Sequence, residues 1–375
     1  MPVNIKNVLE LLQSKIDAVD NSTSIYDLEY LFKAAKKAAG SVIHEFDSDG
    51  ALPDVNDTNI RIAFIRNRGV VAYNNGKWDY AVGEEVPDLY AVIGSALGYT
   101  MGGYIPGNSN VIDAFSFTSD GNATDVGDLT IARYDLSGGK STTHGYALQG
   151  YPSPTGIVDK FSFASGGNAI SAATTRYNYG SADAQNFENI FLIGGTVVNN
   201  GIDKFALATE TNTTAVASLV QIGYDMAGHS SITHGYSSGG LSPSTINVIQ
   251  KFPFAITSGS STDVGDLVSV KYSGAGVSSQ TYGYWAGGSP TADMLQKFPF
   301  ATDTNASNVG SLATQGGSTY VSGNQSGENG YATGFYAPPS AKYDQIQKWP
   351  FATDTNASAI GFLSASHFHA ASTSN

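Results

Sequence analysis

Apolar and aromatic positions recur at a regular spacing over most of this chain. The reference copy is residues 295–312, LQKFPFATDTNASNVGSL, in which an aromatic pair precedes a polar turn and a second apolar run. Six copies are present, and their first aromatic residues are Phe115, Phe161, Phe205, Phe252, Phe298 and Trp349. These residues are 46, 44, 47, 46 and 51 positions apart. A β-type period of this length is typical of a propeller blade or a solenoid turn.

Each copy predicts four strands. One ends in Gly-Gly or a variant, the next carries the aromatic pair, and a third contains the Val-Gly-Asp-Leu motif of residues 126–129 or its equivalent. Residues two apart share one face of a strand, so we expect the aromatic pairs to be buried between blades.

The fourth strand is expected to follow the Leu of that motif and to carry an aromatic residue in register. These residues are Tyr134, Tyr179, Tyr224 and Tyr272, with Gly317 and Phe368 in the related place of the last two copies. Aromatic residues at equivalent repeat positions are expected to pack between blades. Lining of a channel, or sugar binding, is the alternative.

The two ends of the repeat region predict a closed ring. The first copy begins at residues 97–103 and lacks the strand that should precede it. Residues 364–370, in contrast, supply an extra strand after the last copy. A C-terminal strand that completes the first blade removes the open sheet edge of a linear array. We therefore expect a mainly β chain with a six-bladed propeller over residues 91–375.

The order of an arginine, a Gly-Gly strand and an aromatic strand resembles the kelch-type propeller repeat. Arg133 supplies the arginine in the first copy, and the resemblance covers residues 97–375. It implies four-stranded blades around a central channel. The usual Trp between the third and fourth strands is absent, so the expected fold is kelch-like.

The first 40 residues have a helical period. Apolar spacing predicts one helix over residues 3–19 and a second over residues 24–38, with Ser24 as its N-cap and Gly40 after its end. Two short helices cannot bury their own apolar side chains, so we expect an attachment or oligomerisation element, most simply a trimer. A packed N-terminal hairpin is the alternative. The apolar residues concerned are Val8, Leu9, Leu12, Ile16, Leu28, Leu31 and Phe32.

Residues 41–90 predict a small β module followed by a linker. Residues 60–65, 69–73 and 77–80 have strand character, and Asn74-Asn75-Gly76 is a tight-turn sequence. Asp47 and Asp49 precede Gly50, but the later ligands of a calcium loop are missing. An Asx-turn is the better interpretation there.

Composition narrows the classes of partner. The formal charge is −13 and the pI is about 4.7, which argues against a nucleic-acid or anionic-membrane surface. No apolar run approaches the roughly 20 residues that span a bilayer, so no membrane insertion is expected. The chain has no Cys, and hence no disulfide or thiolate metal site.

Candidate chemistry is sparse. His144 and His234 occupy equivalent repeat positions, while His367 and His369 are expected on one face of the closing strand without a third metal ligand. No hydrolase, zinc-protease or nucleotide-binding motif occurs. The sequence therefore predicts no catalytic residue, no cofactor and no metal. Three glycosylation-like sequences are expected to be turns, at Asn122, Asn305 and Asn356.

The overall layout resembles structural proteins of tailed bacteriophages, especially head or tail fibre and decoration proteins. The resemblance rests on the helical leader, the Gly, Ser, Thr and Tyr-rich propeller, and the module's Leu52-Pro53, Gly69 to Val71 and Trp78. It implies a non-enzymatic protein on the virion surface. Its N-terminus would dock on other virion proteins and its propeller would face outward, toward host-surface glycan or a neighbouring protein.

Two other functions stay open. A polysaccharide-degrading propeller, a lyase or glycosidase, would need converging carboxylates and a basic or Tyr residue at one channel mouth. A cellular kelch-like scaffold would need no virion partner. Depolymerisation of host polysaccharide and presence in purified virions distinguish these alternatives.

Overall fold

The computed structural model describes residues 44–46, 62–65, 69–74 and 77–80, and residues 96–375 apart from 153–155, 177–178, 198–199, 291–292, 314–318 and 338–340. The chain divides into two units, Met1–Leu89 and Tyr90–Asn375. The two predicted leader helices and their apolar residues lie outside the described residues, as does the predicted Asx-turn. No helix among the described residues is long and apolar enough to cross a bilayer.

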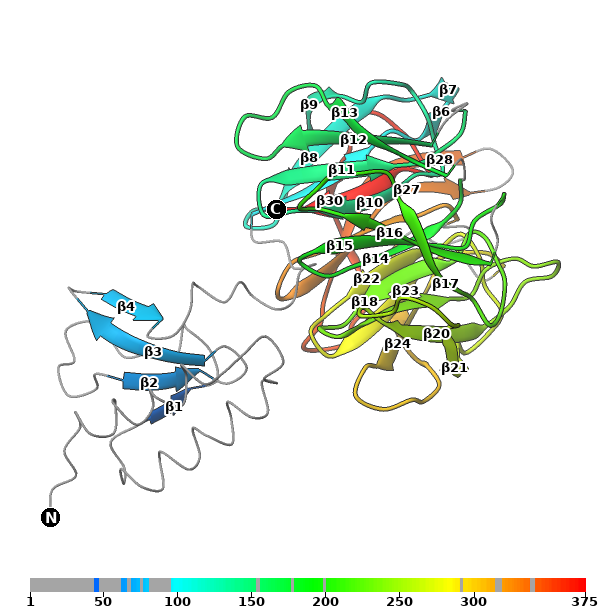
Figure 1. The fold of residues 1–375 in the computed structure, drawn as a ribbon. Helices are drawn as coiled ribbons and strands as arrows, with labels where there is room; N and C mark the ends of the chain where they lie inside the picture. The colour runs from blue at the N-terminus through cyan, green and yellow to red at the C-terminus, as the bar shows by residue number, and fades with distance from the viewer. Residues whose placement is uncertain are drawn as a thin grey trace, which may run out of the picture. The chain divides into compact units, whose positions relative to one another are not determined.

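The N-terminal unit contains a four-stranded sheet in the order β1-β2-β3-β4 (Figure 1). Strands β2 (Ile62–Ile65), β3 (Gly69–Asn74) and β4 (Lys77–Tyr80) form an antiparallel meander at the predicted positions. Asn74 pairs with Lys77, the register of a two-residue hairpin connection. Strand β1 (His44–Phe46) pairs with β2 in parallel and was not predicted, because three residues are too few to show a period.

The C-terminal unit is a propeller of six four-stranded antiparallel sheets around a central axis, which confirms the six blades predicted for this part of the chain (Figure 1). From the innermost strand outward, the first blade is β30 (Ala371–Ser374), β5 (Leu97–Met101), β8 (Val111–Ser116) and β9 (Thr124–Asp128), and the second is β10 (Ser137–Lys140), β11 (His144–Leu148), β12 (Gly156–Ser162) and β13 (Ile170–Thr175). The third blade is β14 (Ala182–Gln185), β15 (Asn189–Ile193), β16 (Gly201–Ala206) and β17 (Thr214–Ser218), and the fourth is β18 (Ala227–Ser230), β19 (His234–Ser238), β20 (Val248–Pro253) and β21 (Thr262–Asp266). The fifth blade is β22 (Ala275–Ser278), β23 (Tyr282–Ala286), β24 (Met294–Pro299) and β25 (Ser307–Ser311), and the sixth is β26 (Ser322–Gln325), β27 (Asn329–Ala337), β28 (Ala341–Pro350) and β29 (Ser358–Phe362). Strands β6 (Tyr104–Ile105) and β7 (Gly107–Asn108) form a small hairpin in the connection between β5 and β8.

The C-terminal strand closes the ring, as predicted. Strand β30 pairs with β5 and becomes the innermost strand of the first blade. The closing residues are Ala371–Ser374 and not the predicted 364–370, which form the connection that leads to the strand. His367 and His369 therefore do not share a strand face. His369 has a φ of 56°, a left-handed conformation that interrupts an extended strand.

The tyrosines predicted to lie on the fourth strand of each copy lie instead in the connection just before that strand. In each copy the strand after the Val-Gly-Asp-Leu motif is the innermost strand of the next blade. Tyr134, Tyr224 and Tyr272 lie in the connection that leads to it, each in an isolated bridge to the segment after the second strand. In the fifth copy Thr319 makes the equivalent bridge, in the place predicted for Gly317.

Aromatic side chains fill the space between blades. Phe298 of β24 is 2% exposed and packs on Tyr236 of the preceding blade, with ring centroids 5.7 Å apart. Phe300 stacks on the same ring at 4.9 Å. Within its own blade Phe298 lies opposite Gly283, where an added Cβ would be 2.4 Å from the Phe ring. The other blades repeat this arrangement with Phe115 on Tyr331, Phe161 on Tyr99, Phe205 on Tyr146, Phe252 on Phe191 and Trp349 on Tyr284.

Asparagines tie the outer strands of neighbouring blades together. The Oδ1 atoms of Asn122, Asn305 and Asn356 accept hydrogen bonds from the outer strand of the preceding blade, at 3.2, 3.0 and 3.0 Å. Asn168 and Asn212 make the same contact. These side chains hold the rim of the ring, which explains why the polar segment after each aromatic pair contains asparagine.

Candidate functional site

Six equivalent residues form a hydrogen-bonded ring at one end of the central channel. Each backbone N–H donates to the carbonyl of the equivalent residue one blade earlier, at 2.7 to 3.1 Å. The ring closes on itself because the residue before β30 bonds to the residue before β10. We call it the mouth ring, and its members are Asp135, Gly180, Asp225, Ser273, Tyr320 and His369.

The mouth ring requires a left-handed backbone at every position. The six φ angles lie between 52° and 65°, a region that favours Gly, Asn and Asp. Tyr320 and His369 adopt it although their side chains are bulky. Six hydrogen bonds that close into a ring hold this conformation. The side chains of the same residues surround the channel opening.

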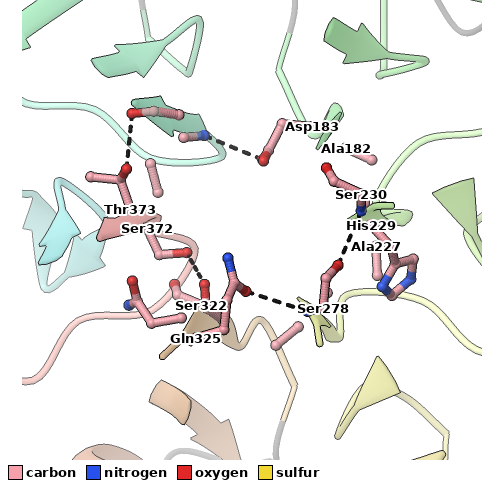
Figure 2. A pocket seen from close by; sticks show the side chains of 18 of the residues that line it. Ala182, Asp183, Ala227, His229, Ser230, Ser278, Ser322, Gln325, Ser372 and Thr373 are labelled. Carbon is pink, nitrogen blue, oxygen red and sulfur yellow. Dashed lines mark hydrogen bonds between the residues drawn. The ribbon is translucent and has the colours of Figure 1, made fainter. Parts of the chain in front are cut away.

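The opening is a cavity of about 90 Å³ lined by the whole mouth ring. It shares Leu136, Met226 and Val321 with a larger cavity of about 140 Å³ that runs between the six innermost strands. Figure 2 looks into this larger cavity, where Asp183, Ser278 and Ser372 come from three different innermost strands and lie around one opening. The mouth therefore leads into a channel with polar walls.

Hydrogen bonds across the channel wall fix its width. The N–H of Gln185 donates to Ser230 Oγ at 2.9 Å. The N–H of Ser230 donates to Ser278 Oγ at 3.0 Å (Figure 2). Neighbouring strands lie so close that a Cβ at Gly228 would be 1.9 Å from the carbonyl oxygen of Asp183. A ligand longer than the mouth would have to fit this narrow, rigid bore.

Two carboxylates in this region lack a basic partner. Asp225 Oδ2 accepts a hydrogen bond from Ser273 Oγ at 3.1 Å, and burial raises the pKa of Asp225 to about 6. Asp183 accepts from the N–H of Gly138 at 3.3 Å, and burial raises its pKa to about 7. No described Lys or Arg forms an ion pair with either carboxylate. Burial therefore makes both negative charges costly.

The third carboxylate of the site is held by a histidine. His369 Nδ1 contacts Asp135 Oδ1, and the His369 ring stacks on Tyr320 at 3.6 Å. Burial lowers the pKa of His369. The Asp135 carboxylate balances any proton on the imidazole, so the pair adds no net positive charge to the mouth.

Aromatic rings extend outward from the mouth. Tyr104, Tyr134, Tyr151 and Tyr179 follow one another with ring centroids 5.3 to 5.5 Å apart. Tyr104 and Tyr151 are 37% and 41% exposed. Phe368 joins Tyr104 to Tyr336 and Tyr320 on the other side, at 5.2 to 6.0 Å. We call this surface the aromatic face.

Exposed aliphatic side chains lie at the same end of the propeller. In an antiparallel blade, the connections from the second to the third strand and from the fourth to the next blade are at one end. Of the 11 large apolar residues exposed in the described part of the chain, eight lie in these connections. Besides Tyr104 and Tyr151 they are Ile131, Val197, Val220, Ile222, Val268 and Val270.

The predicted repeat residues divide between two places. The six Phe and Trp residues lie in the inter-blade core, remote from the mouth. Tyr134 and Tyr179 belong to the aromatic face, and the phenols of Tyr224 and Tyr272 lie close enough to Tyr320 to raise its pKa, after burial and Asp225. His144 and His234 lie at the start of second strands, at the other end, and each Nδ1 contacts a Thr hydroxyl at 2.8 Å.

The mouth residues themselves were not predicted. A signal was present, because Asp135, Asp225 and Ser273 each follow a tyrosine of the in-register series and His369 follows Phe368. The six residue types differ, however, so nothing in the repeat pattern marks them as one site. Only the backbone hydrogen bonds show their equivalence.

No protein-family model matches this chain, and no curated protein matches it. Among the described residues, no group of three or more His, Asp or Glu side chains is placed to hold a metal ion. The geometry itself indicates a binding site with hydroxyl, carboxylate and aromatic groups around a small opening, set in an apolar surface.

Proposed function

We propose that this chain is a non-enzymatic structural protein of the tailed-bacteriophage type, in which the aromatic face contacts host-surface glycan. The N-terminal segment docks on other virion proteins, and the propeller is displayed on the virion surface. The attachment role rests on the sequence resemblance. The contact role is supported by one observation above others, the clustering of exposed tyrosines and aliphatic residues at a single end of the propeller.

The chemistry of the aromatic face suits a carbohydrate. Aromatic rings offer flat apolar area together with a polar tip, and carboxylates and hydroxyls around a shallow opening fix orientation. With a formal charge of −13 on the chain, long-range electrostatics oppose anionic partners. Neutral or cationic glycans are therefore favoured over sialylated or uronate-rich ones.

A glycan-binding assay with matched surface variants tests the contact. The double change Tyr104→Ala and Tyr151→Ala should weaken binding of host polysaccharide at least about tenfold, as for truncation of interfacial aromatic anchors. Ile232→Ala, which removes an equally exposed apolar side chain at the opposite end, should leave binding unchanged. Equal binding by the double variant and the wild-type chain would contradict the proposal.

The attachment role has separate tests. We expect the protein in purified virions, and its absence there would favour the cellular-scaffold alternative. A chain that begins near Pro87 should be monomeric by light scattering, whereas the full chain should form an oligomer, with a trimer favoured, or bind a virion protein. A full chain that stays monomeric and binds no virion component would remove the support for docking.

The enzyme alternative is favoured by one specific observation. Asp135, Asp225, Tyr320 and His369 all line one channel mouth, which is the set of residue types that a propeller lyase or glycosidase would need. A depolymerisation assay on host polysaccharide decides between the functions. Turnover that disappears in both Asp135→Asn and Asp225→Asn would replace the binding function with catalysis.

A further inference from the structure

We infer that the mouth ring binds an ammonium group of its ligand, so that the glycan recognised at this face carries a free amino sugar. This inference deepens the proposed function and rests on it for the source of the ligand. The chemistry of the mouth itself points to the ammonium.

The first argument is the uncompensated carboxylate of Asp225. Its Oδ2 accepts from Ser273, while no described residue donates to Oδ1. The carboxylate lines the mouth cavity, so a ligand can reach it. A buried charge without a partner is unfavourable, and a bound cation removes that cost directly.

The second argument is the set of groups that face Asp225. Ser273, Tyr320 and the Asp135–His369 pair line the same cavity, and none of them brings a net positive charge to it, because the Asp135 carboxylate faces His369. Ser273 and Tyr320 have oxygen lone pairs that can accept a hydrogen bond. An ammonium group has three N–H donors and needs acceptors of this kind. The mouth therefore provides acceptors without a competing cation.

The third argument is the position of the chain's own cations. Lys140 is the only lysine or arginine among the residues that line the larger cavity, and it lies at the far end of β10, away from the mouth ring. Lys271 and Arg133 are buried and donate to backbone carbonyls of the neighbouring segment, Gly287 and Gln149. None of these groups lines the mouth cavity.

The fourth argument is selectivity by size and charge. A cavity of about 90 Å³ is well below the roughly 300–1,000 Å³ of a typical ligand pocket, so it suits one small head group and not a whole sugar. An N-acetyl group is neutral and larger, and a carboxylate or phosphate is repelled by Asp135 and Asp225. The rest of the sugar would remain on the aromatic face.

The test compares three sugars that differ at one position. Glucosamine, N-acetylglucosamine and glucose are titrated into the full-length protein at pH 7 by calorimetry, with methylammonium as a probe of the ammonium group alone. Glucosamine should bind at least about tenfold more tightly than the other two sugars, the usual difference for a charge-assisted hydrogen bond. Equal affinity for all three sugars, or preference for the acetylated one, would overturn the inference.

Asp225→Asn is the decisive variant. The amide can still accept from Ser273, so the fold is retained, but the preference for glucosamine should be lost. Asp263→Asn is the matched control, because Asp263 is exposed on the outer strand β21 and loses the same charge far from the mouth. A preference that survives in Asp225→Asn would also overturn the inference.

The pH dependence provides an independent readout. Because the pKa of Asp225 is raised to about 6, the carboxyl group is largely protonated at pH 5 and ionised at pH 7. Methylammonium keeps its charge between pH 5 and pH 7, so its affinity should rise about tenfold over that interval and stay flat in Asp225→Asn. A flat profile in the wild-type chain would show that Asp225 does not contact the cation.

The inference and the proposed function fail in different ways. Binding of neutral host glycan that depends on Tyr104 and Tyr151, without any preference for glucosamine, refutes the ammonium site and keeps the glycan-contact role. Binding of glucosamine and methylammonium without binding of any host polysaccharide keeps the site and refutes the role.

Discussion

At the inter-blade interfaces the side chains repeat, whereas at the mouth only the backbone repeats. Five of the six interfaces pack a Phe or Trp on a tyrosine, and the sixth uses Phe191. The mouth ring repeats the same hydrogen bond six times, but its side chains differ in size, from the hydrogen of Gly180 to the phenol ring of Tyr320. A position that only has to fill space converges on one solution. A position that does not have to fill space can carry different side chains in different blades. At the mouth these differences break the sixfold symmetry of the ring, at the place where a ligand would bind.

The largest expected effect combines both regions. Deletion of residues 364–375 removes β30, one ladder of the first blade, and with His369 two hydrogen bonds of the mouth ring. Such a loss is large beside the ~5–15 kcal/mol stability of a typical domain, so the truncated protein should aggregate. A melting temperature equal to that of the full chain would contradict ring closure by β30.

The next effect belongs to the inter-blade core. Phe298→Ala should lower the free energy of unfolding by about 3–5 kcal/mol, because the ring is buried against Tyr236 and Gly283 offers no side chain to fill the space. Urea denaturation measures the change. Because the six interfaces are equivalent, Phe161→Ala should have a similar cost. A cost below about 1 kcal/mol at both sites would show that the repeated aromatic residues are not the core.

A smaller effect concerns the channel wall. Because the pKa of Asp183 is raised to about 7, the folded state holds its proton more tightly than the unfolded chain, whose Asp pKa is about 3.9. The stability due to this bound proton is full below pH 4 and is lost as the pH rises through 7. Asp183→Asn should therefore stabilise the protein at pH 8, by at most about 4 kcal/mol, and change little at pH 4.

Denaturant titrations at the two pH values check this prediction. Asp263→Asn is again the control, since an exposed carboxylate on an outer strand should give the same stability difference at both. Equal effects of Asp183→Asn at pH 4 and pH 8 would mean that the carboxylate is hydrated in the channel.

The smallest effect on stability is expected at the aromatic face. Tyr151→Ala should change the free energy of unfolding by no more than about 0.5 kcal/mol, because the side chain is 41% exposed. The same variant should weaken ligand binding. A thermal-shift measurement beside the glycan titration tests both, and a large loss of stability would mean that the face is structural packing.

The sequence by itself determined the number of blades, their order and their closure. The repeated aromatic pair, with Phe252 and Phe298 as examples, can be recognised in the sequence because side chains alternate between the two faces of a single strand. The spacing of the pairs equals the length of one blade. The missing first strand and the extra segment after Leu363 predicted closure by the same counting, although the closing strand lies at Ala371–Ser374. The prediction placed this strand too early because a connecting segment precedes the innermost strand of each blade.

Only the tertiary structure decided where the site is. Asp135, Asp225, Ser273, Tyr320 and His369 lie up to 234 positions apart, and their side chains share no pattern. They meet because a left-handed residue at one position of each blade turns its N–H toward the preceding blade, and six such turns close around the axis. Hydrogen bonds between blades depend on the curvature of the whole ring, which no single repeat contains.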